Sequence, residues 1–199
     1  MPRRLRPLIL ASSSLYRRVL LERLGLAFEC ARPEADETPL PGEAFERTAQ
    51  RLAELKARAV APRFPGALII GSDQVASCAG ERMYKPGSHE NALRQLRHLS
   101  GRSARFDTAV CLLDAASGRL ASRNVPCEVV FRELSPALIA QYLAREQPYD
   151  CAGSAKSEGL GIALIAAMRT DDPTSLIGLP LIALTGLLAE FGQPVLATQ

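Results

Sequence analysis

The sequence predicts an α/β domain in which short apolar strands alternate with amphipathic helices. Continuous apolar runs at residues 8–10 and 67–70 have the length of buried strands. The segment from Glu43 to about Val60 instead repeats its apolar residues at spacings of four and three, the period of one helix face. With 199 residues, 47% of them hydrophobic, the chain can bury a substantial core as one domain, residues 1–199, which can consist of two lobes.

The composition favours a small anionic ligand over a nucleic acid. The formal charge is only +3 and the lysines and arginines are scattered, whereas a nucleic-acid-binding protein usually carries a basic patch. Five cysteines, widely spaced and without a C-x-x-C pair, indicate neither a disulfide framework nor a zinc site and fit a reducing cytoplasm. Because only two histidines are present, we expect oxygen ligands for any metal ion, which points to Mg²⁺ or Mn²⁺.

No segment has the pattern of a signal peptide or a membrane span. The basic residues 1–7 are followed by too few apolar residues for a signal-peptide core. The longest apolar stretch, residues 176–189, is too short to cross a bilayer and is interrupted by Gly178, Pro180 and Thr185. We therefore expect a cytoplasmic protein without a membrane partner.

The strand expected at residues 8–10 leads through three consecutive serines into the first expected helix. That helix has the composition of a mostly buried segment over residues 19–24, and Gly25 is placed to end it in the left-handed conformation. The serines therefore lie at a junction between a strand and a helix.

This junction has the chemistry of an anion site. The first N–H groups of a helix lack intrahelical partners and the helix dipole is positive there, which suits a phosphate. Ser12 and Ser14 add hydroxyl groups, and Arg17 and Arg18 add charged, fork-shaped donors. A serine before a helix is equally an ordinary N-cap, so this motif alone names no reaction.

An acidic loop at residues 31–39 follows a short strand expected at residues 28–30. Its Glu37 is a candidate for a functional carboxylate, although a solvated loop would carry the same residues.

In the next expected helix, Lys56 falls within the apolar stripe. Such a lysine either extends its amine along the surface into water or aims it at an anion in a cleft.

Asp73 interrupts the apolar pattern of a buried strand, because Val75 resumes the strand character beyond it. A carboxylate there is costly unless it is hydrogen-bonded, paired or metal-bound, which favours a functional role. A hairpin turn expected at residues 78–81 then returns the chain, so that Lys85 can face the same pocket.

The remaining segments are expected to form scaffold and a second glycine-rich loop. Residues 151–161 place three glycines around Lys156 and Glu158, which indicates either close approach of the backbone to a ligand or tight turns. The other expected elements are helices at residues 88–101 and 135–146, strands at residues 106–112, 128–131 and 162–165, a turn at residues 171–174, and a closing helix that ends at residues 191–192.

Taken in order, these segments resemble the Maf family of nucleoside triphosphate pyrophosphatases over almost the whole chain. The matching segments are LILASSSLYRR, ARPEADET, RLAELKA, IIGSDQV, YKP, CAGSAKSEGLG and GLPLIAL. Each segment is weak alone, whereas the ordered set is specific. Leu15 departs from the family's usual proline, which presets the first helical turn, but this departure removes no functional group.

The resemblance implies the fold of that family: an α/β architecture with a curved mixed β-sheet, flanking helices and two lobes around a central cleft. It also implies hydrolysis of a nucleoside triphosphate to the monophosphate and diphosphate with a divalent cation. A triphosphate is strongly anionic, so attack by water requires its charge to be neutralised. The roles carried over are Asp73 as proton acceptor or metal ligand, two alternatives that the sequence leaves open, and Glu37 as metal ligand. Lys56 and Lys85 are carried over as catalytic cations, and Ser12, Ser14, Arg17 and Arg18 as phosphate-binding residues.

The chain is similar in particular to the branch of the family that hydrolyses 7-methyl-GTP. Tyr16, Gln74 and Glu158 match that branch at positions where the pyrimidine-triphosphate branch carries arginine, threonine and glutamine. The face of Tyr16 would attract the cationic 7-methylguanine, and Glu158 could accept hydrogen bonds from its N–H groups. The alternative is that Tyr16 only packs on its helix and Glu158 is a solvated turn residue.

Two other functions remain compatible with the sequence. One is a pyrophosphatase for other non-standard purine or pyrimidine triphosphates. The other is a nucleic-acid-binding regulator of cell division, a role attached to the family's name, against which the modest charge and the 5% aromatic content argue. The expected partners are a nucleoside triphosphate substrate and a second copy of the chain in a homodimer.

Overall fold

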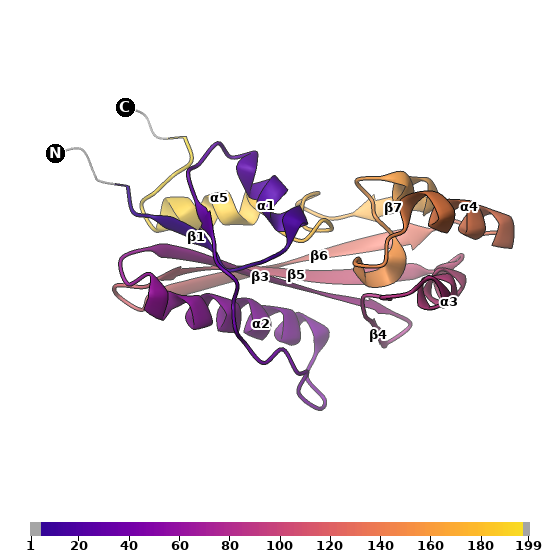
Figure 1. Ribbon diagram of the computed structural model, residues 1–199, viewed down its shortest axis with the longest axis horizontal. Helices are drawn as coiled ribbons and strands as arrows, with labels where there is room; N and C mark the ends of the chain where they lie inside the picture. Colours follow the sequence, from indigo (N-terminus) through magenta and orange to yellow (C-terminus); the bar gives the residue numbers. More distant parts are fainter. Residues whose placement is uncertain (1–4, 197–199) are drawn as a thin grey trace.

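One mixed β-sheet runs through the computed structural model, which describes residues 5–196 (Figure 1). The strands are β1 (Leu8–Leu10), β2 (Glu29–Cys30), β3 (Leu68–Cys78), β4 (Glu81–Met83), β5 (Ser103–Asp114), β6 (Leu120–Phe131) and β7 (Ile165–Arg169). Their order is β2-β1-β3-β5-β6-β7, and β4 pairs separately with β3. β1 lies parallel to β2 and β3, whereas the other pairs are antiparallel.

Helices cover both faces of this sheet. They are α1 (Leu15–Glu22), α2 (Phe45–Val60), α3 (His89–Leu99), α4 (Pro136–Glu146) and α5 (Leu181–Glu190), with short 3₁₀ helices at Ala61–Arg63, Ala152–Ser154 and Leu160–Leu164. α1 and α5 lie on one face and α2 lies on the opposite face, while α3 and α4 lie at the other end of the sheet (Figure 1). Within residues 5–196, no helix has both the length and the apolar character that a bilayer span requires.

Side chains of the single strand β3 pack into three different hydrophobic clusters. Leu68 and Ile70 pack with α1 and α5, whereas Ile69 packs with α2, because successive side chains point to opposite faces of a sheet. Further along β3, Ala76 and Cys78 join a separate core with α3 and α4. The sheet therefore carries two lobes, and the expected α/β fold with a mixed sheet and flanking helices is confirmed.

Helix α1 begins at Leu15 and not at residue 19. The difference arises because Ser14 caps the helix, with its side-chain oxygen accepting a hydrogen bond from the Arg17 N–H at 3.4 Å. The helix ends at Glu22, and Gly25 has a φ of +65°, the left-handed conformation expected for it.

Three strands differ from the sequence-based expectation. β3 continues through Asp73, since its backbone pairs with β5 and Asp73 lies opposite Ala109. β6 begins at Leu120 and not at residue 128, because pairing with β5 extends through Pro126 and polar neighbours that hide the strand in the sequence. The strand expected at residues 162–165 is wrong, since a 3₁₀ helix occupies Leu160–Leu164 and β7 begins at Ile165.

Two further expectations concern the ends of the chain. Of the basic stretch 1–7, residues 1–4 lie outside the described residues, while Arg6 forms an ion pair of 2.7 Å with Asp114 of β5. The extent of the domain over residues 1–199 stays a prediction, because residues 197–199 also lie outside the described part.

Helix α2 approaches the sheet closely at Gly71 of β3. A Cβ atom added to Gly71 would overlap the Ala53 carbonyl oxygen of α2 and press on the Cys111 sulfur of β5. Glycine at this position therefore sets how near α2 lies to β3.

We expect Gly71→Ala to lower the free energy of unfolding by about 1–3 kcal/mol, because the added methyl group has no room between α2 and β3. Gly186→Ala is the matched control. Gly186 is exposed in α5 and an added Cβ meets nothing within 4 Å, so alanine should raise stability by about 0.5–1 kcal/mol. Urea unfolding measures both changes, and an unchanged stability of Gly71→Ala would contradict the close packing of α2.

Candidate active site

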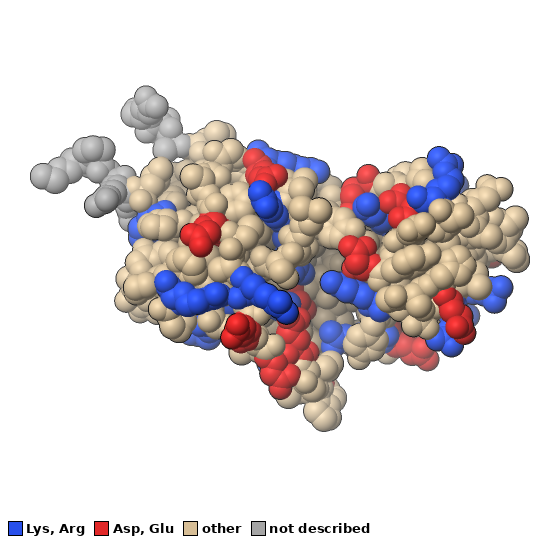
Figure 2. All heavy atoms as spheres, in the orientation of Figure 1, with Lys and Arg blue, Asp and Glu red and all other residues tan. Residues whose placement is uncertain are grey.

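A cleft of about 930 Å³ lies between the two lobes. Its walls come from the N-terminal end of α1, from α2 and β3, from the loop between β4 and α3, and from the loop after α4. Figure 2 shows charged side chains of both signs around the hollow between the lobes. The cleft is lined by all but one of the predicted site residues: Ser12, Ser14, Tyr16, Arg17, Glu37, Lys56, Asp73, Gln74, Lys85 and Glu158.

The centre of the cleft is an ammonium group held between two carboxylates. Lys56 Nζ lies 2.5 Å from Asp73 Oδ1 and 2.8 Å from Glu37 Oε2. The side chains of Lys56 and Asp73 are only 7% and 9% exposed, whereas that of Glu37 is 52% exposed. Lys56 therefore does not extend along the surface into water, since its amine is buried in the cleft and paired.

Two rigid elements bring this ion pair together. Lys56 lies on the buried stripe of α2 that the helical period predicts, and Asp73 lies on β3. The close approach of α2 at Gly71 brings the two charges into direct contact across the layers. Glu37 comes from the irregular segment before α2, so it is the only member of the trio that does not lie on a helix or strand.

The serine loop caps α1 and also lines the cleft. Ser14 caps α1, and Ser12 accepts a hydrogen bond from the Ser14 N–H at 3.1 Å through its side-chain oxygen. The loop nevertheless lines the cleft at the positive end of the α1 dipole, where an anion is favoured. N-cap and anion site are thus compatible at this junction.

Arg17 is held from behind by a backbone carbonyl. Its Nε donates a hydrogen bond of 2.8 Å to the carbonyl of Gly178, which also accepts one of 2.9 Å from the buried Ser72 hydroxyl. Burial lowers the pKa of the Arg17 guanidinium, while the carboxylates of Asp73 and Glu37 raise it. The remaining guanidinium nitrogens are left to contact a ligand in the cleft.

The structure does not bring Arg18 to the cleft. Its Nε lies 2.9 Å from Glu22 Oε1 one turn along α1, and its side chain is exposed. Adjacent residues of a helix point in different directions, so Arg17 and Arg18 cannot both face the same ligand. Lys85 does line the cleft and is exposed at its rim.

Tyr16, Gln74 and Glu158 meet at the cleft from three separate segments. The amide nitrogen of Gln74 donates to Thr108 Oγ1 at 2.9 Å and lies 3.0 Å from the backbone carbonyls of Ser175 and Leu176. The amide N–H groups of Gln74 are therefore already hydrogen-bonded within the protein. Glu158 is exposed, whereas Tyr16 is partly buried.

Sequence reasoning missed three residues that support the cleft. The Gly178 carbonyl holds Arg17, Ser72 donates a hydrogen bond to that same carbonyl, and Asp150 accepts the hydrogen bond of the Tyr16 hydroxyl. Ser72 adjoins Asp73 on β3, so a polar residue in a buried strand was the available signal. Asp150 gave no signal, because its partner lies 134 residues away in the chain.

Glu37 and Asp73 are the carboxylates that could hold a metal ion here. Within residues 5–196 there is no group of three or more His, Cys, Asp or Glu side chains arranged for a metal ion. Mg²⁺ is commonly held by one or two carboxylates together with substrate phosphates. The residues present therefore fit an ion that enters with its nucleotide, and not a preformed all-protein metal site.

The family model of Maf-like proteins matches residues 7–191 of the chain. The chain belongs to the Maf family. Proteins named 7-methyl-GTP pyrophosphatase from Cupriavidus pinatubonensis and Methylobacillus flagellatus are both 57% identical to it over 190 residues, with 96% of this chain and 96% and 99% of theirs covered. The protein of that name from Paraburkholderia xenovorans is 55% identical over 195 residues, with 96% of this chain and 95% of its own covered.

Two solved structures also resemble this Maf-family chain. The Staphylococcus aureus Ham1 protein aligns with a TM-score of 0.46 and 14% identity, over 64% of this chain and 72% of its own. A HAM1 protein from Coxiella burnetii aligns with a TM-score of 0.45 and 17% identity, over 66% and 76%. With TM-scores below 0.5 and identities below 25%, these two alignments support no conclusion about the function of this chain.

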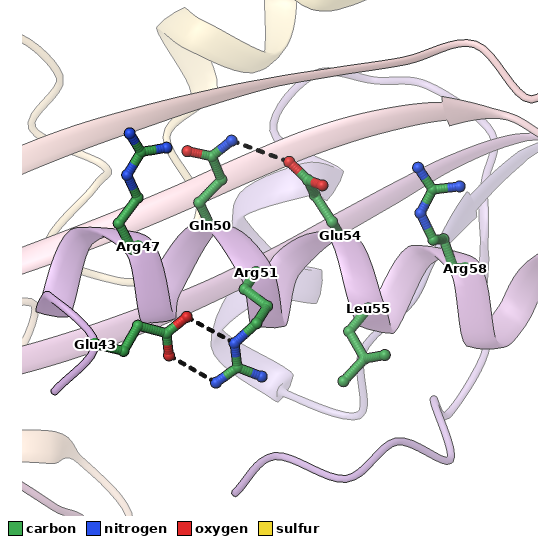
Figure 3. Close-up of a pocket in the computed structure, with 7 residues that line it drawn as sticks. All are labelled: Glu43, Arg47, Gln50, Arg51, Glu54, Leu55 and Arg58. Atoms are coloured by element: carbon green, nitrogen blue, oxygen red, sulfur yellow. Dashed lines mark hydrogen bonds and ion pairs between the residues drawn. The ribbon is translucent and has the colours of Figure 1, made fainter. Parts of the chain in front are cut away.

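A second pocket of this Maf-family chain, about 370 Å³, lies along the outer face of α2 (Figure 3). Two contacts link residues of its lining, since Arg51 donates two hydrogen bonds of 2.8 Å to Glu43 and Gln50 donates to Glu54 at 3.0 Å. The hydrogen bonds from Arg51 lower the pKa of Glu43 to about 2. The Glu43–Arg51 pair in this pocket therefore fixes the segment before α2 to the helix. The cleft, and not this pocket, is the candidate active site.

Glu43 should make the stability of the protein pH-dependent. Because its folded pKa is below its unfolded value of 4.5, its stabilising effect is present above pH 4.5 and is lost as the pH falls toward about 2. We expect Glu43→Gln to have a lower melting temperature than wild type at pH 7 and the same melting temperature near pH 2. Glu46→Gln, in the exposed first turn of α2, is the control and should show a smaller difference at pH 7. A Glu43→Gln deficit that persists unchanged at pH 2 would contradict the assigned ion pair.

Proposed function

We propose that this protein hydrolyses 7-methyl-GTP to 7-methyl-GMP and diphosphate, which would remove a modified nucleotide from the cellular pool. The observation that carries the proposal is the buried amine of Lys56 between the carboxylates of Asp73 and Glu37, in a cleft that also contains Arg17 and Lys85. The names of relatives between 54% and 57% identical support the choice of substrate.

In the proposed reaction, a water molecule attacks the α-phosphorus. Its oxygen forms the new P–O bond, the bond from the α-phosphorus to the bridging oxygen breaks, and diphosphate leaves with that electron pair. Asp73 accepts the proton of the attacking water. Lys56 contacts Asp73 through Oδ1, which leaves Oδ2 to receive the proton.

The charge of the trio explains why a divalent cation is part of the proposal. One ammonium and two carboxylates sum to a charge of −1, which would repel a triphosphate. When bound, Mg²⁺ or Mn²⁺ would neutralise the phosphate oxygens, with Glu37 as its protein ligand. Asp73 is the alternative second ligand, a role that competes with proton acceptance for Oδ2 because Lys56 contacts Oδ1.

The other cations and the serine loop would bind the phosphates away from the ion. Arg17 is already oriented by its hydrogen bond to the Gly178 carbonyl, so its other nitrogens can contact phosphate oxygens without a change of side-chain rotamer. Lys85 at the rim adds a mobile positive charge, and Ser12–Ser14 add donors at the start of α1. Arg18 is left out of this proposal. The homodimer, the cytoplasmic location and the absence of a nucleic-acid partner stay predictions.

We expect Asp73→Asn to lower kcat by about 10²-fold or more with the fold retained, because it removes the proton acceptor and keeps the shape. Asp107→Asn is the matched control, since Asp107 is buried and paired with Arg105 on β5 but lies outside the cleft. Diphosphate release with Mg²⁺, with Mn²⁺ and after chelation measures both variants. A folded Asp73→Asn enzyme with the wild-type rate, or full wild-type turnover after chelation, would contradict the mechanism.

We also expect kcat/KM for 7-methyl-GTP to exceed that for GTP, UTP and dTTP, because Tyr16 attracts a cationic base by about 0.5–2 kcal/mol. Tyr16→Arg with Glu158→Gln should erode or invert this preference. Adding Gln74→Thr tests the third position, but this change also frees the Ser175 and Leu176 carbonyls, so the double variant is the cleaner comparison. Equal wild-type values for the four nucleotides would contradict the substrate, and a preference for inosine or xanthosine triphosphate would favour the broader purine alternative.

A further inference from the structure

The hydroxyl of Tyr16 crosses the cleft to the other lobe. It donates to the carboxylate of Asp150, with distances of 3.1 and 3.0 Å to the two oxygens. Tyr16 belongs to α1, which packs in the core with α5, while Asp150 lies in the loop after α4, which packs in the core with α3. Both residues line the cleft, so this hydrogen bond ties the two lobes together at the cleft itself.

The face of the Tyr16 ring is constrained as well. Lys156 Nζ lies 5.6 Å from the ring centroid, and Glu146 holds that amine at 3.1 Å. Burial, with further contributions from Cys151 and Asp150, raises the pKa of the Tyr16 hydroxyl well above 10. The hydroxyl therefore stays protonated as a donor at neutral pH, and the ring is fixed both at its tip and on its face.

We propose that Asp150 is a positioning residue that orients Tyr16 for recognition of the nucleobase. This inference rests on the proposed function. A tyrosine ring can stack on a base only at a defined tilt and depth, and the rotation of its side chain is otherwise limited only by packing. Asp150 removes this freedom by accepting a hydrogen bond from the hydroxyl across the cleft, so base discrimination depends on a residue that need not touch the base.

The test is a double-mutant cycle on Tyr16→Phe and Asp150→Ala, read as the ratio of kcat/KM for 7-methyl-GTP to that for GTP. Both variants keep an aromatic ring and remove only the bond that orients it. We therefore expect each to lower the ratio by at most about 30-fold, the effect of losing a whole cation–π contact. The double variant should lower it no further, and Asp150→Asn should restore part of the ratio because its amide oxygen can accept the same hydrogen bond.

Tyr149→Phe is the matched control. It removes a phenol hydroxyl from the same loop, but Tyr149 lies outside the lining of the cleft and its hydroxyl is 3.1 Å from His89 Nδ1. We expect this variant to keep the wild-type ratio. A purely structural role of Asp150 would lower the melting temperature without moving the ratio.

The outcomes separate this inference from the function on which it rests. A wild-type enzyme without preference for 7-methyl-GTP overturns the proposed substrate. A wild-type enzyme with that preference, together with an Asp150→Ala variant that keeps it or with independent additive effects of the two changes, overturns only the role of Asp150. Non-additive losses of the ratio with an unaffected Tyr149→Phe support it.

Discussion

The contact of Lys56 with Asp73 and Glu37 is the interaction on which the rest of the structure depends. A buried ion pair is seldom more stabilising than well-packed apolar residues of the same volume, whereas removal of one partner costs about 3–5 kcal/mol. The contact is therefore poorly explained by stability alone, and its place in the cleft points to chemistry. It also imposes a constraint on packing, because α2 must lie close enough to β3 for a lysine amine to reach a strand carboxylate. Gly71 meets this constraint by offering no side chain at the point of approach.

The residues that line the cleft come both from regular elements and from loops. Asp73 and Gln74 lie on β3, whose pairing with β5 extends over the whole length of the strand, and Lys56 lies within α2. By contrast, Glu37, Asp150 and Glu158 come from loops. The groups to which the proposed function assigns proton transfer are thus on regular elements, whereas the other cleft carboxylates are on loops, which are generally less rigid.

Much of this could be predicted from the sequence, because local periods determine it. The helical stripe that contains Lys56 and the apolar run before Asp73 gave α2 and the start of β3, and the same strand pattern placed Asp73 in a buried strand. The helical stripe left open whether the Lys56 amine reaches water or the cleft. Tertiary pairing decided the rest. The first half of β6 has few apolar residues and is a strand because β5 pairs with it, and the direction of Arg18 depends on Glu22 rather than on its neighbour Arg17. Asp150 could not have been found locally, since only the fold brings it to Tyr16.

The balance of forces in the cleft shows where selectivity has to arise. Every nucleoside triphosphate presents the same phosphates, so contacts from Arg17, Lys56 and Lys85 would raise affinity for all of them alike. Discrimination must come from the base, yet an exposed carboxylate such as Glu158 competes with water for each hydrogen bond it accepts. A cation–π contact likewise grows from about 0.5–1 kcal/mol when exposed to about 2 kcal/mol when water is excluded. On the proposed function, the width of the cleft would therefore affect selectivity as much as the identity of the residues does. Because the Tyr16–Asp150 hydrogen bond joins the two lobes, it would affect both the tilt of the ring and the access of water to it.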